Sequence, residues 1–277
     1  MLEKIVPLIV TYNEAPNIDR TLDKLNWAKK IVVIDSYSTD STLEILNSYS
    51  QVQIFQHKFD SFASQCNYGL EKINSEWVLS LDADYILTDE LIAEMAALTE
   101  DNSVDGYFVK FKYCIYGKPL RATLLPPRQV LYRREKAKYV DDGHAHRVLV
   151  NGQSAELFSY ICHDDRKPLN RWLSAQNRYM IIESKKLLET PGSELSLPDR
   201  LRKQKFIAPF LILVYCLIVN RAILDGWQGL YYTLQRTLAE IMLSLYLLEN
   251  ENSYAYPNPS SSEHRDKLPL RNAELPN

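Results

Sequence analysis

The sequence lacks the features of a secreted or a nucleic-acid-binding protein. Its four cysteines lie far apart and include no C-x-x-C pair, which argues against a disulfide framework and favours a reducing compartment. The formal net charge of −3 shows none of the basic excess expected for nucleic-acid binding. The first residues, MLEKIVPLIV, mix an acid with a base, and their apolar run is too short for a signal peptide. We therefore expect a cytoplasmic protein without a nucleic-acid partner.

The chain also has no long apolar run. The segment FIAPFLILVYCLIV, residues 206–219, contains Pro209 and is shorter than the roughly 20 residues of a membrane-spanning helix. Arg221 follows it, and the cations that precede it are Arg200, Arg202, Lys203 and Lys205. This pattern predicts a helix in the cytoplasmic leaflet with its basic flank on anionic headgroups, so that the protein is peripheral on the membrane. The alternative is a helical hairpin with residues 230–248 that closes the protein's own core or a homo-oligomer interface.

What the sequence does contain is an alternation of strands and helices. With 277 residues, 46% of them hydrophobic, the chain can form one large or two small domains. Apolar runs predict strands at 5–12, 31–36, 52–55 and 76–84, and helical spacing predicts helices at 15–28, 41–49 and 62–73. Short strands that alternate with helices imply an α/β fold with a parallel sheet. Ligands bind such sheets beyond the carboxyl ends of the strands.

Carboxylates follow three of these strands. The first strand ends at Thr11-Tyr12-Asn13-Glu14, the second at Asp35 and the fourth at Asp82-Ala83-Asp84. Alternation along the fourth strand would point Asp82 and Asp84 to the same side, where like charges repel each other unless a cation lies between them. We therefore predict a divalent metal site at this edge. The simpler interpretation is a strand that runs into an acidic loop.

The succession of strand, TYNE, strand, DSYSTD and DAD resembles family 2 glycosyltransferases, which adopt the GT-A nucleotide-sugar fold with a mixed, mostly parallel sheet. Later segments such as AKYVDDGHAHRV and ICHDDRKPLNRWLSAQNRYM are similar to lipopolysaccharide-core-type members, although His146-Arg147 stands where many of these carry His-Glu. The resemblance implies a catalytic domain at 1–168, with a nucleotide half at 1–100 and an acceptor half at 101–168. A helical, membrane-associated region at 169–250 and a disordered tail at 251–277 would follow.

The resemblance also implies roles at the nucleotide edge. Asp35 would accept the imide N–H of uracil, Asp84 would coordinate Mn²⁺ or Mg²⁺, and Asp82 would lie beside the ribose and the metal. His163 is the expected additional metal ligand. The other residues expected to bind the nucleotide sugar are Thr11, Tyr12, Asn13, Glu14, Gln65, Asn67, Ala83, Arg128 and Arg166. For the glutamine, the second asparagine and the two arginines, an ordinary solvated position is the alternative.

An inverting transfer also needs a base that deprotonates the acceptor hydroxyl. The segment DDGH places Asp141, Asp142 and His144 in a glycine-containing loop. Family 2 enzymes usually carry the base in an acidic pair at about this point of the chain. We predict Asp142 as the base, with Asp141 as its rival, and a surface acidic turn is the simpler interpretation.

The expected activity is the addition of one sugar, from a UDP-sugar to a lipid-linked acceptor or to a lipopolysaccharide or polysaccharide. Arg171-Trp172 is similar to part of the Q-x-x-R-W signature of processive synthases, but Pro168 stands in place of the glutamine, which argues against polymerisation. Two alternatives remain open. LDADYI is also similar to the nucleophile strand of haloacid-dehalogenase-type phosphatases, and the chain could be an inactive scaffold of the same fold.

Overall fold

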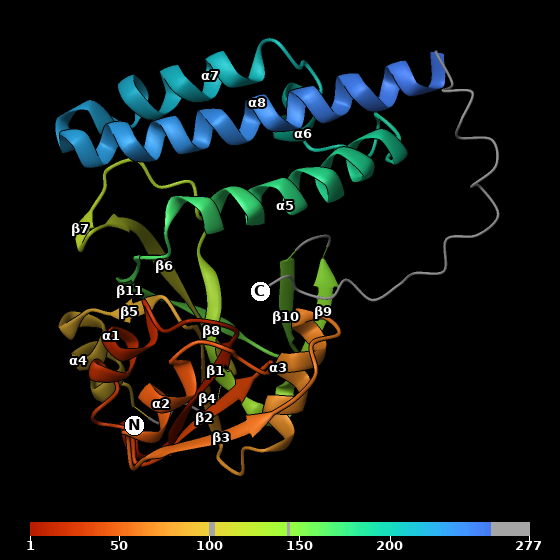
Figure 1. Ribbon diagram of the computed structural model, residues 1–277. Coiled ribbons are helices and arrows are strands. Elements are labelled where there is room, and N and C mark those ends of the chain that lie inside the picture. Colours follow the sequence, from red (N-terminus) through yellow and green to blue (C-terminus); the bar gives the residue numbers. More distant parts are fainter. Residues whose placement is uncertain (100–102, 143–144, 256–277) are drawn as a thin grey trace.

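The computed structural model describes residues 1–99, 103–142 and 145–255. These residues form a sheet domain flanked by short helices, and a layer of longer helices that lies against one side of it (Figure 1). His144 of the DDGH segment and residues 256–277 of the tail expected to be disordered lie outside the described residues, whereas residues 251–255 of that tail are helical.

A single nine-stranded sheet organises the first domain, in the order β3-β2-β1-β4-β8-β6-β11-β5 with β7 paired to β6. Its strands are β1 (Ile5–Thr11), β2 (Ile31–Asp35), β3 (Val52–Gln56), β4 (Trp77–Asp82), β5 (Tyr85–Leu87), β6 (Gly106–Ile115), β7 (Lys118–Pro119), β8 (Arg128–Arg133) and β11 (Ser154–His163). The first four strands are parallel, β8 and β5 run antiparallel to their neighbours, and β11 is parallel to β6. The predicted α/β fold with a mixed sheet is confirmed.

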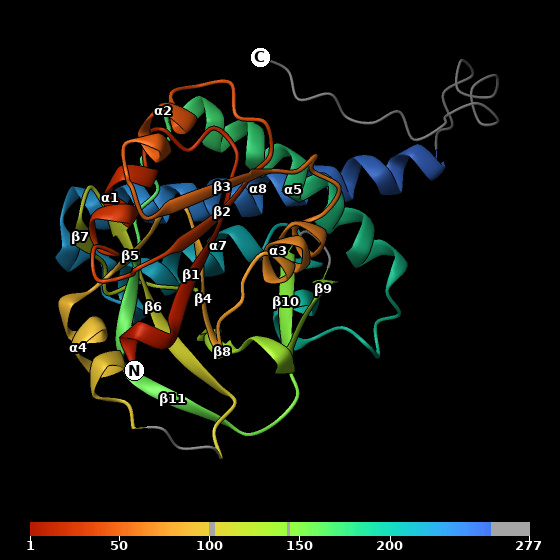
Figure 2. The same cartoon turned by 90° about the horizontal axis from the view of Figure 1, so that it is seen from below.

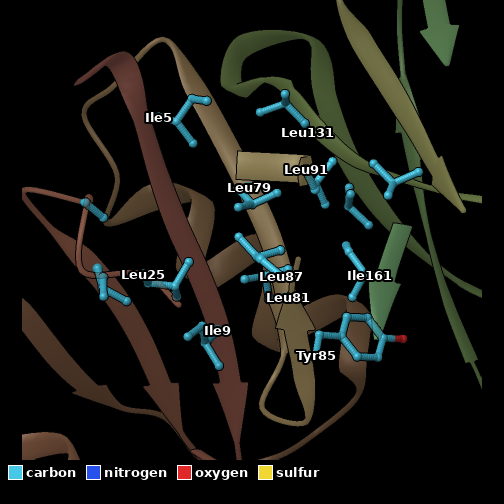
Figure 3. Close-up of a cluster of buried hydrophobic side chains, with 14 of the residues drawn as sticks. Ile5, Ile9, Leu25, Leu79, Leu81, Tyr85, Leu87, Leu91, Leu131 and Ile161 are labelled. Atoms are coloured by element: carbon cyan, nitrogen blue, oxygen red, sulfur yellow. The ribbon is translucent and has the colours of Figure 1, made fainter. Parts of the chain in front are cut away.

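Helices cover both faces of the parallel strands. Alternate residues of β2 point into two different clusters, as the pleat of a strand requires. Ile31 and Val33 pack under α1 (Ile18–Asp23) and α2 (Thr42–Asn47), in the cluster that Figure 3 shows in part. Val32 and Ile34 pack under α3 (Phe62–Glu71). A further helix, α4 (Asp89–Ala97), contributes Leu91 to the first cluster.

The strand register brings the polar ends of three strands to the same level. Thr11 pairs with Asp35 on one side of β1, and Val10 pairs with Asp82 on the other. The loops that follow β1, β2 and β4 therefore start side by side, as the sequence predicts. Strand alternation was expected to point Asp82 and Asp84 to the same side. That argument was wrong, because β4 ends at Asp82 and a turn at 83–84 leads into β5.

A separate two-stranded hairpin carries the acidic pair of the DDGH segment. Its strands β9 (Ala137–Asp142) and β10 (Ala145–Val150) pair Asp142 with Ala145. The side-chain amide of Asn67 on α3 holds this hairpin, since it donates to the Tyr139 carbonyl over 3.0 Å and accepts from the Tyr139 N–H over 2.9 Å. The hairpin is thus anchored to α3.

The helical layer follows the last strand of the sheet (Figures 1 and 2). It comprises α5 (Leu169–Glu189), α6 (Leu197–Arg202), α7 (Ala208–Val214), a π-helical turn (Tyr215–Val219), a 3₁₀ turn (Ala222–Asp225) and α8 (Trp227–Ala255). Met180 and Leu187 of α5 pack against Leu243 and Leu247 of α8. Within the described ranges, no helix combines the length and apolarity needed to cross a bilayer.

Candidate functional site

The loop after β1 is held by the loop after β2. Asn13 has a left-handed backbone (φ 54°), a conformation that asparagine tolerates better than most residues. Its side-chain oxygen accepts from the N–H groups of Thr39 (2.7 Å) and Asp40 (3.3 Å). The backbone N–H of Glu14 donates to the hydroxyl of Thr42 over 2.8 Å. The TYNE and DSYSTD segments therefore form one structural unit at the carboxyl edge.

Asp35 lies fully buried at the end of β2. Its carboxylate accepts hydrogen bonds from the Thr11 hydroxyl (3.1 Å), from the N–H and hydroxyl of Ser38 (2.9 and 2.5 Å) and from the Gln56 amide (3.5 Å). A carboxylate offers about four lone-pair positions, so these four hydrogen bonds use all the acceptor positions of Asp35. The uracil contact expected for Asp35 thus requires one of them to leave, and the Gln56 amide forms the longest of the four bonds.

Asp84 and His163 meet at the carboxyl edge. The β5–β11 ladder pairs Tyr85 with His163, and His163 Nε2 lies 3.0 Å from Asp84 Oδ2. Burial is the largest influence on each group and works against both charged forms, but the partner's opposite charge, the hydrogen bond between them and other nearby charges together outweigh it. The pKa of His163 is therefore raised and that of Asp84 is lowered. Nδ1 of His163 is buried without a hydrogen-bond partner among the described residues. Of the three residues predicted at the metal, Asp84, Asp82 and His163, the first and the last are therefore adjacent.

The segment His163–Lys167 covers the site as a strap. Lys167 Nζ lies 2.7 Å from Glu14 Oε1, while the Asn17 amide donates to Glu14 Oε2 over 2.9 Å. Burial raises the pKa of Glu14 to about 7, although the charge of Lys167 opposes the shift. The pKa of Lys167 is raised because the charges of Glu14 and Asp84 outweigh its burial. Lys167 thus pairs directly with Glu14, and its charge also acts on Asp84.

The middle of the strap is tied to helix α1. Asp164 accepts from Arg20 (2.8 Å) and from Arg166 Nε (3.0 Å), and Asp165 accepts from the Asn17 amide (2.9 Å). The guanidinium of Arg166 also lies 5.2 Å from the ring centre of Tyr116. Arg166, expected to meet phosphate, is therefore turned toward Asp164 in this conformation.

Asp82 and Arg128 are linked through Tyr85. Arg128 donates to the Tyr85 hydroxyl over 3.0 Å, and that hydroxyl also hydrogen-bonds Asp82. Burial, with the charge of Asp82, raises the pKa of Tyr85 well above its ordinary value. Ala83, between the two acids, is buried, and its carbonyl accepts from the Thr21 hydroxyl over 2.7 Å. Arg128 is thus one side chain away from the D-x-D turn.

Two expected nucleotide ligands have structural roles. Both hydrogen-bonding groups of the Asn67 amide are used by Tyr139, and the buried Gln65 donates to the carbonyl of His57 over 3.0 Å. Asp141 lies on the same side of the domain, where it accepts from the N–H of Ala63 over 3.3 Å. These side chains support α3 and the hairpin in this structure, and the nucleotide contacts of Gln65 and Asn67 stay predictions; the buried Oε1 of Gln65 has no hydrogen-bond partner among the described residues.

Sequence reasoning underestimated the strap. Lys167, Asn17, Asp164 and Asp165 are not among the site residues predicted from the sequence. The signal for them is the run HDDRK, which follows the apolar strand β11 directly and so begins at the same edge as His163. Arg171, in the first turn of α5, also reaches the site and donates to the carbonyl of Asn13 over 3.0 Å. A run of charges at a strand end is informative even without a recognised motif.

The donor set at Asp84 fits a divalent ion in part. Carboxylate oxygen suits Mg²⁺ and Mn²⁺, and imidazole nitrogen is accepted by the transition metals. In the described part of the chain, no three His, Cys, Asp or Glu side chains are arranged to hold an ion by themselves. Asp84 and His163 therefore fit a site in which the remaining ligands come from a bound molecule and water.

The chain matches the family model described as "Glycosyl transferase family 2" over residues 8–154. It therefore belongs to glycosyl transferase family 2, as the resemblance predicts, and the described sheet agrees with the GT-A fold expected for that family.

Relatives carry corresponding names. The chain is 34% identical over 217 residues to glycosyltransferase SunS of Bacillus phage SPbeta, covering 69% of this chain and 49% of that protein. It is 23% identical over 194 residues to the lipopolysaccharide core biosynthesis glycosyltransferase LpsC of Rhizobium meliloti, covering 66% and 71%. An uncharacterized glycosyltransferase of Rickettsia bellii is 30% identical over 108 residues, or 39% of this chain and 36% of that one. The chain thus aligns with between a third and a half of the SunS and Rickettsia proteins.

Solved structures of similar arrangement include residues 1–349 of S. aureus TarS in complex with UDP-GlcNAc, with a TM-score of 0.47 and 16% identity over 92% of each chain. Another is glucosyl-3-phosphoglycerate synthase from Mycobacterium tuberculosis in complex with Mn²⁺, UDP and phosphoglyceric acid. Its TM-score is 0.43 and its identity 13%, over 70% of this chain and 82% of that one.

Proposed function

We propose that the protein is an inverting, metal-dependent glycosyltransferase that moves one sugar from a nucleotide sugar, with UDP as the nucleotide, to a lipid-linked or other glycan acceptor. The observation that carries the proposal is the group formed by Asp84, His163, Glu14 and Lys167 at the carboxyl edge of the parallel strands. In this group, Asp84 and His163 can donate to a metal ion, and Lys167 lies near them as a positive charge. A diphosphate with a bound divalent ion needs both kinds of partner. Membership in family 2 supports the same chemistry.

Asp84 and His163 are the residues that would hold the divalent ion. When bound, such an ion neutralises charge that develops on the leaving diphosphate. Lys167 provides a positive charge of the chain's own at this position, and it is held by Glu14 until a phosphate competes for it. Thr11 and Asp35, behind this group, form the floor on which the base would rest.

The acceptor hydroxyl must lose its proton as it attacks the sugar carbon from the face opposite the leaving group. We assign this proton to Asp142, with Asp141 as the alternative. Both belong to β9, and the hairpin that carries them is fixed to α3 through Asn67 and Tyr139. Positioning of the base therefore depends on this anchor, since small displacements of a catalytic group cost large factors in rate.

Single addition and a membrane-side location complete the proposal. Pro168 is the N-cap of α5, and Arg171, at the arginine of the processive signature, supports the TYNE loop through the Asn13 carbonyl. A structural role for this arginine fits a non-processive enzyme. We also keep the prediction that the protein works peripherally at the cytoplasmic face of a membrane.

The two alternatives predict different behaviour. A phosphatase of the haloacid-dehalogenase type would form a phosphoryl-enzyme at Asp82, whereas the chain belongs to family 2, whose match begins at residue 8 and includes the TYNE and DSYSTD segments. An inactive scaffold of the same fold would bind no donor. Donor binding is therefore the property to measure first.

The test is thermal unfolding with a panel of nucleotide sugars, each with Mn²⁺ and with chelator. A ligand at 100 times its Kd stabilises the folded state by about 2.7 kcal/mol, which corresponds to a rise in Tm of roughly 5–10 °C for a domain of this size. We expect this rise for at least one UDP-sugar with Mn²⁺, and little change with chelator. If no nucleotide sugar raises the Tm in either condition, the scaffold interpretation replaces the proposal.

A further inference from the structure

The outer side of the helical layer exposes large apolar side chains over its whole length. Between residues 206 and 245 they are Phe206, Ile207, Phe210, Leu211, Tyr215, Ile218, Val219, Ile223, Leu224, Trp227, Leu230, Leu234, Leu238, Ile241 and Leu245, which we call the α7–α8 face. Their exposed fractions run from 37% at Leu238 to 81% at Phe206. Soluble monomers rarely expose an apolar patch larger than roughly 300–600 Å². The combined exposed area of these fifteen side chains exceeds this size.

Helix α8 shows that the face is separate from the core. Every exposed position from 227 to 248 carries a large apolar residue, at the spacing of one helical stripe. Another side of the helix is buried against α5 and α7 through Tyr232, Ala239, Leu243 and Leu247. In Figure 1, α8 lies between α5 and α7, and the exposed stripe is on a side of α8 that neither helix covers. The hairpin considered from the sequence does form, since residues of the apolar run 206–219 pack against α8, but it leaves this stripe uncovered.

The cations before the run are largely engaged by the protein itself. Arg202 is bound to Glu183 (2.8 Å) and Glu240 (3.1 Å), and Lys205 is paired with Glu251. Arg200 donates to the carbonyls of residues 195 and 193 over 3.0 and 3.2 Å. The basic flank expected to bind anionic headgroups thus has mainly a structural role. Arg221 is the one exposed charge between residues 206 and 248, a stretch that the structure describes in full.

We infer that the α7–α8 face docks the protein on a lipid bilayer, by shallow insertion of apolar side chains and not by attraction to anionic headgroups. The face is two helices wide, whereas a two-helix dimer seam needs a narrower stripe. Protein interfaces also have a polar rim with about one hydrogen bond per 100–200 Å², and the exposed polar groups here are limited to Arg221, Tyr215 and Trp227. Arginine, tyrosine and tryptophan are the residue types that lie at headgroup level. This inference does not rest on the proposed enzymatic function.

Flotation of the full chain with vesicles is the test, using neutral phosphatidylcholine and vesicles that also contain phosphatidylglycerol, at low and high salt. We expect flotation with both lipids and less than about a threefold loss on raising the salt, because screening weakens only the ionic part of binding. The triple variant Ile218→Gln, Leu234→Gln, Leu245→Gln should lower the partition coefficient roughly 100-fold. These positions are 55–68% exposed, so the fold should persist.

Two controls separate the outcomes. Phe158→Gln removes a side chain that is 88% exposed on β11, outside the face, and should leave flotation unchanged. Lys203→Gln with Arg221→Gln should leave flotation with neutral vesicles unchanged, since a surface cation contributes through anionic headgroups. Flotation that needs anionic lipid and disappears at high salt would overturn the inference. A wild type that does not float overturns it too, and light scattering then shows whether a second copy covers the face, as a dimer that the triple variant dissociates.

Discussion

The carboxyl edge of the sheet and the α7–α8 face differ in how their side chains are satisfied. At the edge, charged groups are buried and joined in pairs, such as Glu14 with Lys167 and Asp84 with His163. On the face, large apolar side chains are exposed to solvent. A third arrangement is found inside the helical layer, where Arg202 forms ion pairs with Glu183 of α5 and Glu240 of α8.

The difference indicates what each region is built to meet. Buried ions are costly unless they are paired, so the paired groups at the edge form a polar site whose internal partners a charged ligand would replace in the proposed function. Exposed apolar area is costly unless it is covered, so the face matches an apolar environment. The two regions therefore respond to different substitutions, charge removal at the edge and apolar removal on the face.

The largest effect is expected at the acidic pair of β9. Asp142→Asn should lower the transfer rate roughly 10²–10⁴-fold, the usual range for a lost general base, while donor affinity stays unchanged. Steady-state kinetics with calorimetric measurement of UDP binding separate the two quantities. If Asp142→Asn keeps the wild-type rate and Asp141→Asn is inactive, the base is Asp141.

Removal of the cation between the helices should affect stability and not membrane binding. Arg202→Gln leaves the buried Glu183 and Glu240 without their shared partner, and we expect a loss of about 2–3 kcal/mol in the free energy of unfolding. The value is below the range for fully buried pairs because the Arg202 side chain is 23% exposed. Lys203→Gln is the matched control, with an expected change below about 0.5 kcal/mol in urea unfolding. An equal effect of both substitutions would contradict the structural role.

The anchor of the β9–β10 hairpin links stability to activity. Asn67→Ala removes both hydrogen bonds to Tyr139 and should cost about 1–2 kcal/mol, and it should lower the transfer rate more than donor affinity. Asn47→Ala, where the amide bonds only the Leu43 carbonyl of its own helix, should cost less than about 0.5 kcal/mol. If Asn67→Ala loses UDP affinity but keeps its transfer rate, the result would support the predicted contact between Asn67 and the nucleotide and contradict the anchoring role.

The smallest effect concerns the protonation of Glu14. Its folded-state pKa of about 7 lies above the ordinary carboxyl value, so the folded protein binds the extra proton between about pH 4.5 and 7. Stability from this group is therefore present below that window and declines as the pH rises through it. The free energy of unfolding of the wild type relative to Glu14→Gln should fall from pH 5 to pH 8 in denaturant unfolding, because only the wild type loses this proton. A wild type that gains stability relative to Glu14→Gln as the pH rises would show that the carboxylate is the favoured form.

Local patterns were sufficient for the sheet but not for the site. The strands at 5–11, 31–35, 52–56 and 77–82 follow from apolar runs bounded by polar residues, and the parallel topology brings their ends together. Whether Asp35 has free lone pairs depends on Ser38 and Gln56, which no local pattern reveals. The partners Glu14 and Lys167 are far apart in sequence, so only the folded chain shows them as a pair.

The helical layer shows the same limit from the other direction. Helical spacing of Leu230, Leu234, Leu238, Ile241 and Leu245 identifies an apolar stripe on α8, but periodicity does not say whether a stripe is covered. The stripe is exposed, and the side that is buried contains Leu243 and Leu247 together with polar residues such as Glu240. The polar residue is tolerated there because Arg202 pairs with it.

The central claim is that the carboxyl edge binds a nucleotide diphosphate through a divalent ion at Asp84. Titration calorimetry of UDP into the wild type, Asp84→Asn and Asp89→Asn, each with Mn²⁺ and with chelator, tests it most directly. Asp89, which pairs with Lys24 on the surface, is the matched control. We predict that Mn²⁺ increases UDP affinity at least about tenfold in the wild type and in Asp89→Asn, and not in Asp84→Asn. Equal UDP affinity of the wild type with Mn²⁺ and with chelator would contradict the claim.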